Sequence, residues 1–298
     1  MGNNTYIIDP ESVAEIGRLI DQDRLITQAM GGLFPPDFDP SGVRRVLDVA
    51  CGPGGWVQEV AYHYPEISVT GIDISSSLMR YADKLAKVQG LANATFQVVD
   101  ATKRLPFADA TFQVVNARFV NAFLPTWQAW RRLVSEMARV TAPGGLLRLT
   151  EADDPGLTNS PAFERMKALT LQAGQLDKRP YPITPSLRRL LREVGCQKLC
   201  SQAYALCFSS EEAGFQGHYE NCRVLFQLLH RFLIKKGVAT QEDLNRLYEQ
   251  ILCEMRAEDF AGIWYLFSAW GYKPQPGALS PHPLEKEISS EAGVGGDQ

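Results

Sequence analysis

Apolar runs of strand length alternate with segments of helical spacing through the first half of the chain. Between residues 43 and 151 the helical segments place an apolar residue every three or four positions, and the strand segments are short and largely apolar. This alternation predicts a mostly parallel sheet covered by helices on both faces. The expected strands are 43–50, 68–73, 95–100, 112–116 and 145–151, and the expected helices are 56–64, 76–89 and 126–140.

The segments on either side of this core are also patterned. Residues 11–30 have helical spacing, with Val13, Ile16, Leu19 and Ile20 along one side, so a helix should precede the first strand. The remaining expected elements are a helix at 186–194, an extended segment at 195–208, helices within 211–236 and 241–257, and a final strand at 261–272.

The last two strands complete a sheet of seven. Residues 195–208 and 261–272 are separated by more residues than a hairpin loop uses, and the residues between them have helical spacing. We therefore expect this intervening segment to form a helical cap. Residues 155–184 form a second expected insertion, after the fifth strand.

Composition excludes some classes of protein but does not identify the function. The 298 residues carry 30 Lys and Arg against 34 Asp and Glu, a net charge of −4, which argues against a general nucleic-acid-binding protein. No apolar run approaches the length of a membrane span, and Met1 to Pro10 lack a secretory signal, so we expect a cytoplasmic protein. The six cysteines lack the spacing of a metal site, so free thiols and no metal are expected.

The most informative local sequence is VLDVACGPGGW at residues 46–56, where an apolar strand runs into a glycine turn. A strand, a glycine turn and a helix form a nucleotide-binding crevice, because glycine lets a ligand approach the backbone closely. A dinucleotide-binding fingerprint would have a third glycine where this chain has Val57, and it would have no acid at Asp48. An acid beside the turn favours a ligand that carries a positive charge.

Further landmarks follow in order along the chain. Asp73 ends a strand 25 residues after Asp48, at a place where an acid accepts hydrogen bonds from ribose hydroxyls. Asp100 ends the next strand, where a carboxylate could accept from an adenine amino group. Residues 139–147, RVTAPGGLL, read as a helix end, a turn and a new strand. This combination resembles the class I S-adenosylmethionine (SAM)-dependent methyltransferases, in particular the branch that includes quinone-biosynthesis C-methyltransferases and many natural-product methyltransferases. The resemblance is strong over residues 43–155.

The resemblance implies an α/β, Rossmann-like class I methyltransferase fold. Such a fold would have a mostly parallel seven-stranded sheet with helices on both faces, here with an N-terminal helix and helical cap insertions. The expected segments are an N-terminal helical extension at 1–40, a SAM-binding core at 41–155, an insertion and return to the sheet at 156–209, a helical substrate cap at 210–260, a final strand at 261–274 and a disordered tail at 275–298.

The resemblance also implies which residues hold SAM and its product, S-adenosyl-L-homocysteine (SAH). The glycine turn would frame the methionine end, the acids that end the second and third strands would hold the ribose and the adenine, and the residues after the fourth strand would lie beside the sulfonium. The expected cofactor-binding residues are Asp48, Ala50, Gly52, Gly54, Asp73, Ile74, Asp100, Ala101, Asn116 and Arg118.

The acceptor site is expected between the core and the insertions. A histidine of the cap could deprotonate the acceptor near neutral pH, which makes His218, His230 and the adjacent Tyr219 the catalytic candidates. The alternative for both histidines is a packed or solvated side chain. Glu151 and Asp153 are further candidates for contact with the acceptor, or else capping or solvated acids. Aromatic side chains are dense in and around the cap, which suits a hydrophobic small molecule: Phe208, Phe215, Tyr219, Phe226, Phe232, Trp264 and Tyr265.

Three other functions compete with small-molecule methyl transfer. A macromolecular methyltransferase acting on amino groups would carry an Asn or Asp, two prolines and an aromatic after the fourth strand, whereas this chain has NARF at residues 116–119. A non-catalytic SAM-binding protein would keep the same cofactor motifs. A nicotinamide-dependent dehydrogenase is disfavoured by Asp48 and Val57. The sequence leaves open whether carbon, oxygen or nitrogen is methylated and whether the N-terminal helix packs across a second copy in a homo-oligomer.

Overall fold

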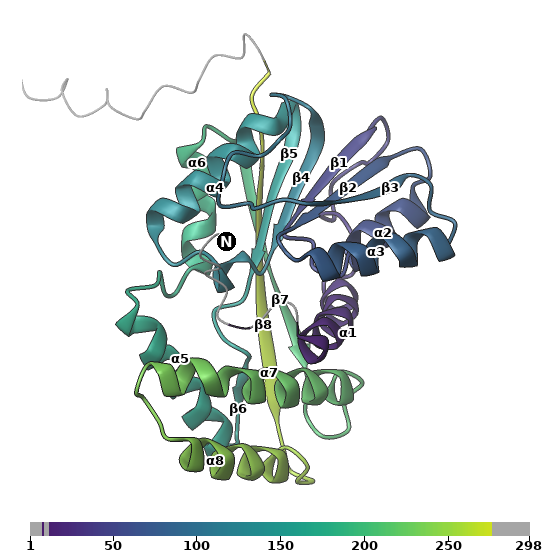
Figure 1. Ribbon diagram of the computed structural model, residues 1–298. Helices are drawn as coiled ribbons and strands as arrows, with labels where there is room; N and C mark the ends of the chain where they lie inside the picture. The colour runs from purple at the N-terminus through teal and green to yellow at the C-terminus, as the bar shows by residue number, and fades with distance from the viewer. Residues whose placement is uncertain (1–7, 9–11, 276–298) are drawn as a thin grey trace, which may run out of the picture.

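A computed structural model describes residues 8 and 12–275, which form a central sheet with helices on both faces (Figure 1). The described residues form an eight-stranded sheet in the order β3-β2-β1-β4-β5-β8-β6, with β7 paired to β8. Strands β1 to β5 are parallel, and β8 runs antiparallel to β5, β6 and β7. The strands are β1 Arg45–Val49, β2 Ser68–Asp73, β3 Ala94–Val98, β4 Phe112–Arg118, β5 Thr141–Glu151, β6 Leu157–Thr158, β7 Gln197–Cys207 and β8 Gly262–Tyr272.

The seven predicted strands are all present, and the fold is the expected mostly parallel α/β architecture. The additional strand, β6, is only two residues long and pairs with the start of β8. Central strands such as β1 are largely apolar because helices cover both of their faces: Val46, Leu47 and Val49 are all fully buried.

Helices α2 and α3 cover one face of the sheet, and α4 and α6 cover the other (Figure 1). Helix α4 shows how the sequence specifies this packing. Trp130, Leu133 and Met137 lie on one side of the helix and are fully buried, and the Thr126 side chain caps its amino end by accepting from the Ala129 N–H at 3.1 Å. The helices are α1 Val13–Ala29, α2 Gly55–His63, α3 Ser76–Val88, α4 Trp127–Val140, α5 Pro161–Leu176, α6 Leu187–Glu193, α7 Phe215–Lys235 and α8 Gln241–Glu254, with 3-10 turns at Val120–Ala122 and Thr184–Ser186.

Helices α5, α7 and α8 form a helical layer beyond the carboxyl end of the parallel strands (Figure 1). This layer has an apolar core of its own, in which Phe163, Phe226, Leu233 and Ile251 are buried together with Phe208. The two helices predicted within 211–236 and 241–257 are confirmed as α7 and α8. Helix α5 comes from the predicted insertion at 155–184 and packs against both of them.

The helix predicted at 11–30 is confirmed as α1, but its buried side differs from the apolar stripe in the sequence. Val13 is 85% exposed, whereas Glu15 and Arg18 are buried. The reason is that α1 packs on α7, and Arg18 donates to the Asn221 side chain of α7 at 2.9 Å while pairing with Glu15 at 2.7 Å. Buried charges of this kind are stable only when they are paired.

Three further observations concern chemistry outside the sheet. Within residues 8 and 12–275, no helix combines the length and the apolar character that a membrane crossing requires. The six cysteines are free thiols, of which Cys51, Cys196 and Cys222 are buried. The predicted tail at 275–298 lies outside the described residues except for Gln275.

Candidate functional site

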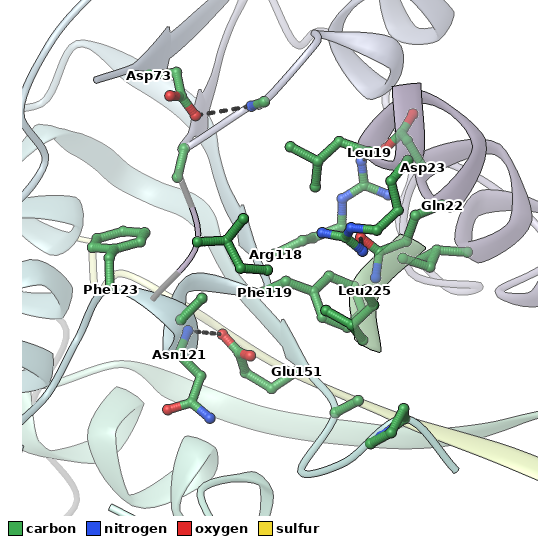
Figure 2. Close-up of a pocket in the computed structure, with 18 of the residues that line it drawn as sticks. Leu19, Gln22, Asp23, Asp73, Arg118, Phe119, Asn121, Phe123, Glu151 and Leu225 are labelled. Atoms are coloured by element: carbon green, nitrogen blue, oxygen red, sulfur yellow. Dashed lines mark hydrogen bonds and ion pairs between the residues drawn. The ribbon is translucent and has the colours of Figure 1, made fainter. Parts of the chain in front are cut away.

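A cavity of about 510 Å³ opens at the carboxyl ends of the parallel strands. It lies where β1 has β2 on one side and β4 on the other, which is the point where the strand order reverses and where ligands bind in sheets of this type. Figure 2 shows Asp73 on one side of the cavity and Leu19, Gln22 and Asp23 of α1 on the other, with Arg118 and Glu151 between them. The cavity therefore has walls from the sheet and from α1, and α5 and α7 add a third wall.

The glycine turn forms one edge of the cavity. Gly52 lines the cavity with a φ of +56°, and no atom lies within 4 Å of the place where a Cβ would sit, so its backbone is accessible to a ligand. Gly54 does not line the cavity: a Cβ there would overlap the ring of Phe96. Its glycine is explained by that packing and by a φ of +79°. The two glycines that the sequence treats alike thus have different surroundings.

Asp73 is oriented by the backbone of its neighbours. One carboxylate oxygen accepts from the Gly52 N–H at 3.1 Å and the other from the Ser75 N–H at 2.9 Å, which ties the end of β2 to the glycine turn. Ile74, next to it, is 45% exposed and lines the cavity. An acid with an apolar side chain beside it suits a nucleoside, which carries hydroxyls on its sugar and a flat apolar base.

Asp100 and Ala101 also line the cavity, but the Asp100 carboxylate is already engaged. It accepts from the Thr102 backbone N–H at 3.0 Å and from the Thr102 hydroxyl at 2.6 Å, and it pairs with Lys103 at 3.1 Å. Burial alone would raise the pKa of Asp100, but these hydrogen bonds outweigh it and hold the pKa below its usual value. Asp100 therefore stabilises its own turn, whatever else it contacts.

Asp48 and Asn116 form a buried pair at the floor of the cavity. The Asn116 amide donates to Asp48 at 2.8 Å, and Asp48 lines the cavity whereas Asn116 does not. Burial raises the pKa of Asp48 to about 7, against the opposing effects of Arg118 and of the Asn116 hydrogen bond. A positively charged ligand above Asp48 would favour its ionised form, so the site is suited to a cation.

Helix α1 contributes a residue that the sequence motifs do not indicate. Asp23 forms an ion pair with Arg118 at the end of β4, and both side chains line the cavity. Arg118 also donates to the Thr27 hydroxyl of α1 at 3.2 Å, and its guanidinium lies 5.9 Å from the centre of the Trp56 ring. The sequence feature that could have pointed to Asp23 is the run of polar residues on α1, but only the fold shows which of them face the sheet.

Glu151 is the buried carboxyl group between the two halves of the cavity. It accepts from the backbone N–H groups of Val120 and Asn121, at 2.7 and 3.2 Å, through the same oxygen, Oε1 (Figure 2). Burial raises the pKa of Glu151 well above its usual value. Asp153 also lines the cavity, but it accepts from the Ile183 and Thr184 N–H groups and so fixes the turn that precedes α6.

The far half of the cavity is largely apolar. Of the aromatic side chains predicted to surround an acceptor, Phe226, Phe232 and Trp264 line the cavity, joined by Leu225 and Leu229 of α7. The other four lie outside its lining: Phe208, Phe215, Tyr219 and Tyr265.

The three predicted catalytic residues do not line this cavity. His218 is fully buried: one ring nitrogen lies 2.8 Å from the Pro155 carbonyl oxygen, and the ring packs between Phe208 and Trp264. Burial lowers the pKa of His218 to about 4, so the ring is neutral at pH 7.

His230 and Tyr219 also lie elsewhere in the helical layer. His230 lies beside Gln241 and Tyr248 of α8, and burial lowers its pKa. The Tyr219 ring packs against Phe215 and lies 5.1 Å from the Arg256 guanidinium. Their role as bases stays a prediction without geometric support, since the structure places them in packing contacts.

Comparison with known proteins gives a consistent result. Residues 46–145 match the family described as Methyltransferase domain. The demethylmenaquinone methyltransferase of Geobacillus kaustophilus is 26% identical over 189 residues, which cover 58% of this chain and 79% of that protein. The ajmaline N-methyltransferase of Rauvolfia serpentina is 35% identical over 125 residues, but the match covers only 42% of this chain and 41% of the relative's length.

A solved structure extends the likeness to most of the fold. The phosphoethanolamine N-methyltransferase 2 of Haemonchus contortus, in complex with SAM, superposes with a TM-score of 0.51 at 18% identity, covering 88% of this chain and 57% of that one. At this identity the structural likeness establishes the fold alone. The similarity to methyltransferases rests on the sequence matches. Over its core the chain is therefore similar to the class I SAM-dependent methyltransferases.

Proposed function

We propose that the protein transfers a methyl group from SAM to a hydrophobic small-molecule acceptor by in-line displacement. The observation that carries this proposal is the continuity of the cavity. One end holds the glycine turn with Asp48 and Asp73, and the other end is lined by apolar side chains of α7, without a partition between them. Two ligands bound in such a cavity would meet near Arg118 and Glu151.

The residues present fit the cofactor. The methyl group on the sulfonium of SAM is already activated, so the protein has to supply binding, alignment and a dry pocket. Asp73 would accept from the ribose hydroxyls, the Gly52 backbone would lie against the methionine end, and the Asp48 carboxylate would offset the positive charge. Ile74 would pack against the adenine.

Glu151 is the group best placed to accept a proton from the acceptor. Its Oε1 is held by two backbone N–H groups. Among the residues of the described chain, no hydrogen bond to the other oxygen, Oε2, is found. Burial raises the pKa of Glu151, and a carboxylate with a raised pKa is, once ionised, a stronger base than an exposed one. An acceptor with an acidic O–H, N–H or C–H could therefore lose its proton to Oε2.

The relatives support the small-molecule class of acceptor. They are named for demethylmenaquinone and ajmaline, and the apolar lining from α7 suits acceptors of that kind. The net charge of −4 gives the chain no overall basic surplus that would attract nucleic acid. A cytoplasmic location and a homo-oligomeric state belong to the same proposal and rest on the sequence alone.

A turnover assay tests this function. The full chain would be incubated with SAM and a panel of quinone-type, indole-type and polyketide-type acceptors, with a protein and an RNA as competing macromolecular acceptors. We expect SAH formation that depends on one of the small molecules, and we expect Glu151→Gln to lower kcat while the affinity for SAH is kept. Methylation of only the macromolecules, or SAM binding without turnover of any acceptor, would overturn the proposal.

A further inference from the structure

An ion pair between α1 and β4 lies inside the cavity rather than on the surface. Asp23 and Arg118 line the cavity next to Asp48 and Gly52, and their side chains are only 14% and 10% exposed. Figure 2 shows Asp23 extending from α1 toward the core, on the cavity side of the helix. An ion pair held away from water keeps far more of its interaction strength than a surface pair.

The glycine turn is built around Asp23. The first residue of α2 is Gly55, and a Cβ at Gly55 would overlap the Asp23 carboxylate. The carboxylate therefore lies directly against the backbone of the turn. On the other side, Arg118 is fixed by the Thr27 hydroxyl and by the Trp56 ring. Each charge thus has a defined place beside the edge of the cavity that Gly52 and Asp48 form.

We infer that Asp23 and Arg118 bind the amino-acid end of SAM, with Asp23 pairing with its ammonium group and Arg118 with its carboxylate. This inference rests on the proposed function and adds a cofactor contact from α1. The amino-acid end carries one positive and one negative group on a single carbon atom, and the two side chains present the complementary pair. On binding, one ion pair is exchanged for two, so no unpaired charge is left buried.

The same arrangement makes α1 part of the cofactor site. Besides Asp23, the helix is held to α7 by Arg18, which donates to Asn221 at 2.9 Å. Because α1 contacts both the end of β4 and the helical layer, a cofactor bound through Asp23 would link these two parts of the molecule. The glycine turn alone would hold the nucleoside without this link.

Calorimetry with matched ligands tests the inference on the full chain. SAM has both charged groups of its amino-acid end, decarboxylated SAM keeps only the ammonium, and 5′-methylthioadenosine has neither. Asp23→Asn should weaken SAM and decarboxylated SAM about tenfold or more while methylthioadenosine changes less than about twofold, since loss of a charge-assisted hydrogen bond has an effect of that size. Arg118→Gln should weaken SAM but leave decarboxylated SAM nearly unchanged.

Asp21→Asn is the matched control, because Asp21 is an exposed acid of the same helix outside the cavity lining. We expect wild-type affinity for all three ligands in this variant. If Asp23→Asn weakens methylthioadenosine as much as SAM, or leaves SAM unchanged, Asp23 does not recognise the amino-acid end and the inference is overturned. If the wild-type protein binds none of the three ligands, the proposed function itself fails.

Discussion

At the residue scale, two unusual backbone conformations lie at the cavity. Two residues that are not glycine have a left-handed φ and line the cavity: Ala50 at +58° and Phe119 at +55°. Such conformations are unfavourable for residues with a side chain, and they persist where the surrounding structure imposes them, as at functional sites. Ala50 follows β1 and Phe119 follows β4, so both conformations lie at the carboxyl ends of strands that border the cavity.

The two turn glycines should respond differently to substitution. Gly54→Ala should lower the free energy of unfolding by about 2–4 kcal/mol, because a Cβ at φ +79° is strained and also overlaps Phe96. Gly52→Ala should cost only about 1–2 kcal/mol, the strain alone, because space is free around its Cβ. Denaturant unfolding measures both losses of stability. Relative to the stability that each variant loses, calorimetry should show a larger loss of SAH affinity in Gly52→Ala than in Gly54→Ala. Equal losses of stability in the two variants would show that overlap with Phe96 is not what requires glycine at position 54.

Asp48 should make SAM binding depend on pH. Burial raises the pKa of Asp48 to about 7 in the free protein, whereas a bound cation favours its ionised form, so binding releases a proton when Asp48 starts out protonated. We expect the affinity for SAM to rise between pH 6 and pH 8 and then to level off. Asp48→Asn should bind more weakly at pH 8 and lack this rise, as measured by calorimetry at each pH. An identical pH dependence in the variant would assign the effect to another group.

At the element scale, the histidines of α7 illustrate a limit of sequence reasoning. The sequence placed His218 near an acceptor as a base, because α7 was correctly predicted as a helix over the core. Helical periodicity does not show which residues face the cavity, however, and His218 faces Phe208 and Trp264 instead. The surroundings of His218 are those of a packed, neutral histidine, and they require no catalytic role.

His218 should instead reduce stability in acid. Its pKa is lowered to about 4 by burial, below the ordinary value of 6.5, so the unfolded chain takes up a proton at a higher pH than the folded chain does. Stability should therefore fall as the pH drops from about 6.5 to 4, by on the order of 3 kcal/mol from this group. In His218→Gln this part of the loss should be absent in urea unfolding at pH 7, 6 and 5. Loss of turnover in that variant, with an unchanged pH profile of stability, would support the base role instead.

At the scale of the whole molecule, local patterns predicted the sheet and its helices to within a few residues. Strand β2 was predicted with its observed bounds, Ser68–Asp73, because its apolar run and its terminal acid are both local signals. The contacts that complete the site join residues far apart in sequence, such as Asp23 with Arg118 and Arg18 with Asn221. No periodicity reports such pairs, and for that reason the role of α1 could not be predicted.

The same distinction separates the two halves of the cavity. The half proposed to bind the cofactor follows from motifs at strand ends, which topology brings together wherever parallel strands are neighbours. The half proposed to bind the acceptor depends on how the helical layer of α5, α7 and α8 packs near Glu151 and Trp264. That packing is set by the shapes of apolar side chains in a separate core, and the sequence showed only that aromatic residues are dense there.

The most direct test of the account is a calorimetric titration of SAH into the full chain and into Asp73→Ala. The central claim is that the cavity at the carboxyl ends of β1, β2 and β4 holds the cofactor, with Asp73 on the ribose. The account predicts one SAH per chain and an affinity at least about tenfold lower in Asp73→Ala, the loss expected for a charge-assisted hydrogen bond. Absence of binding to the wild-type chain, or equal affinity in the two proteins, would contradict it.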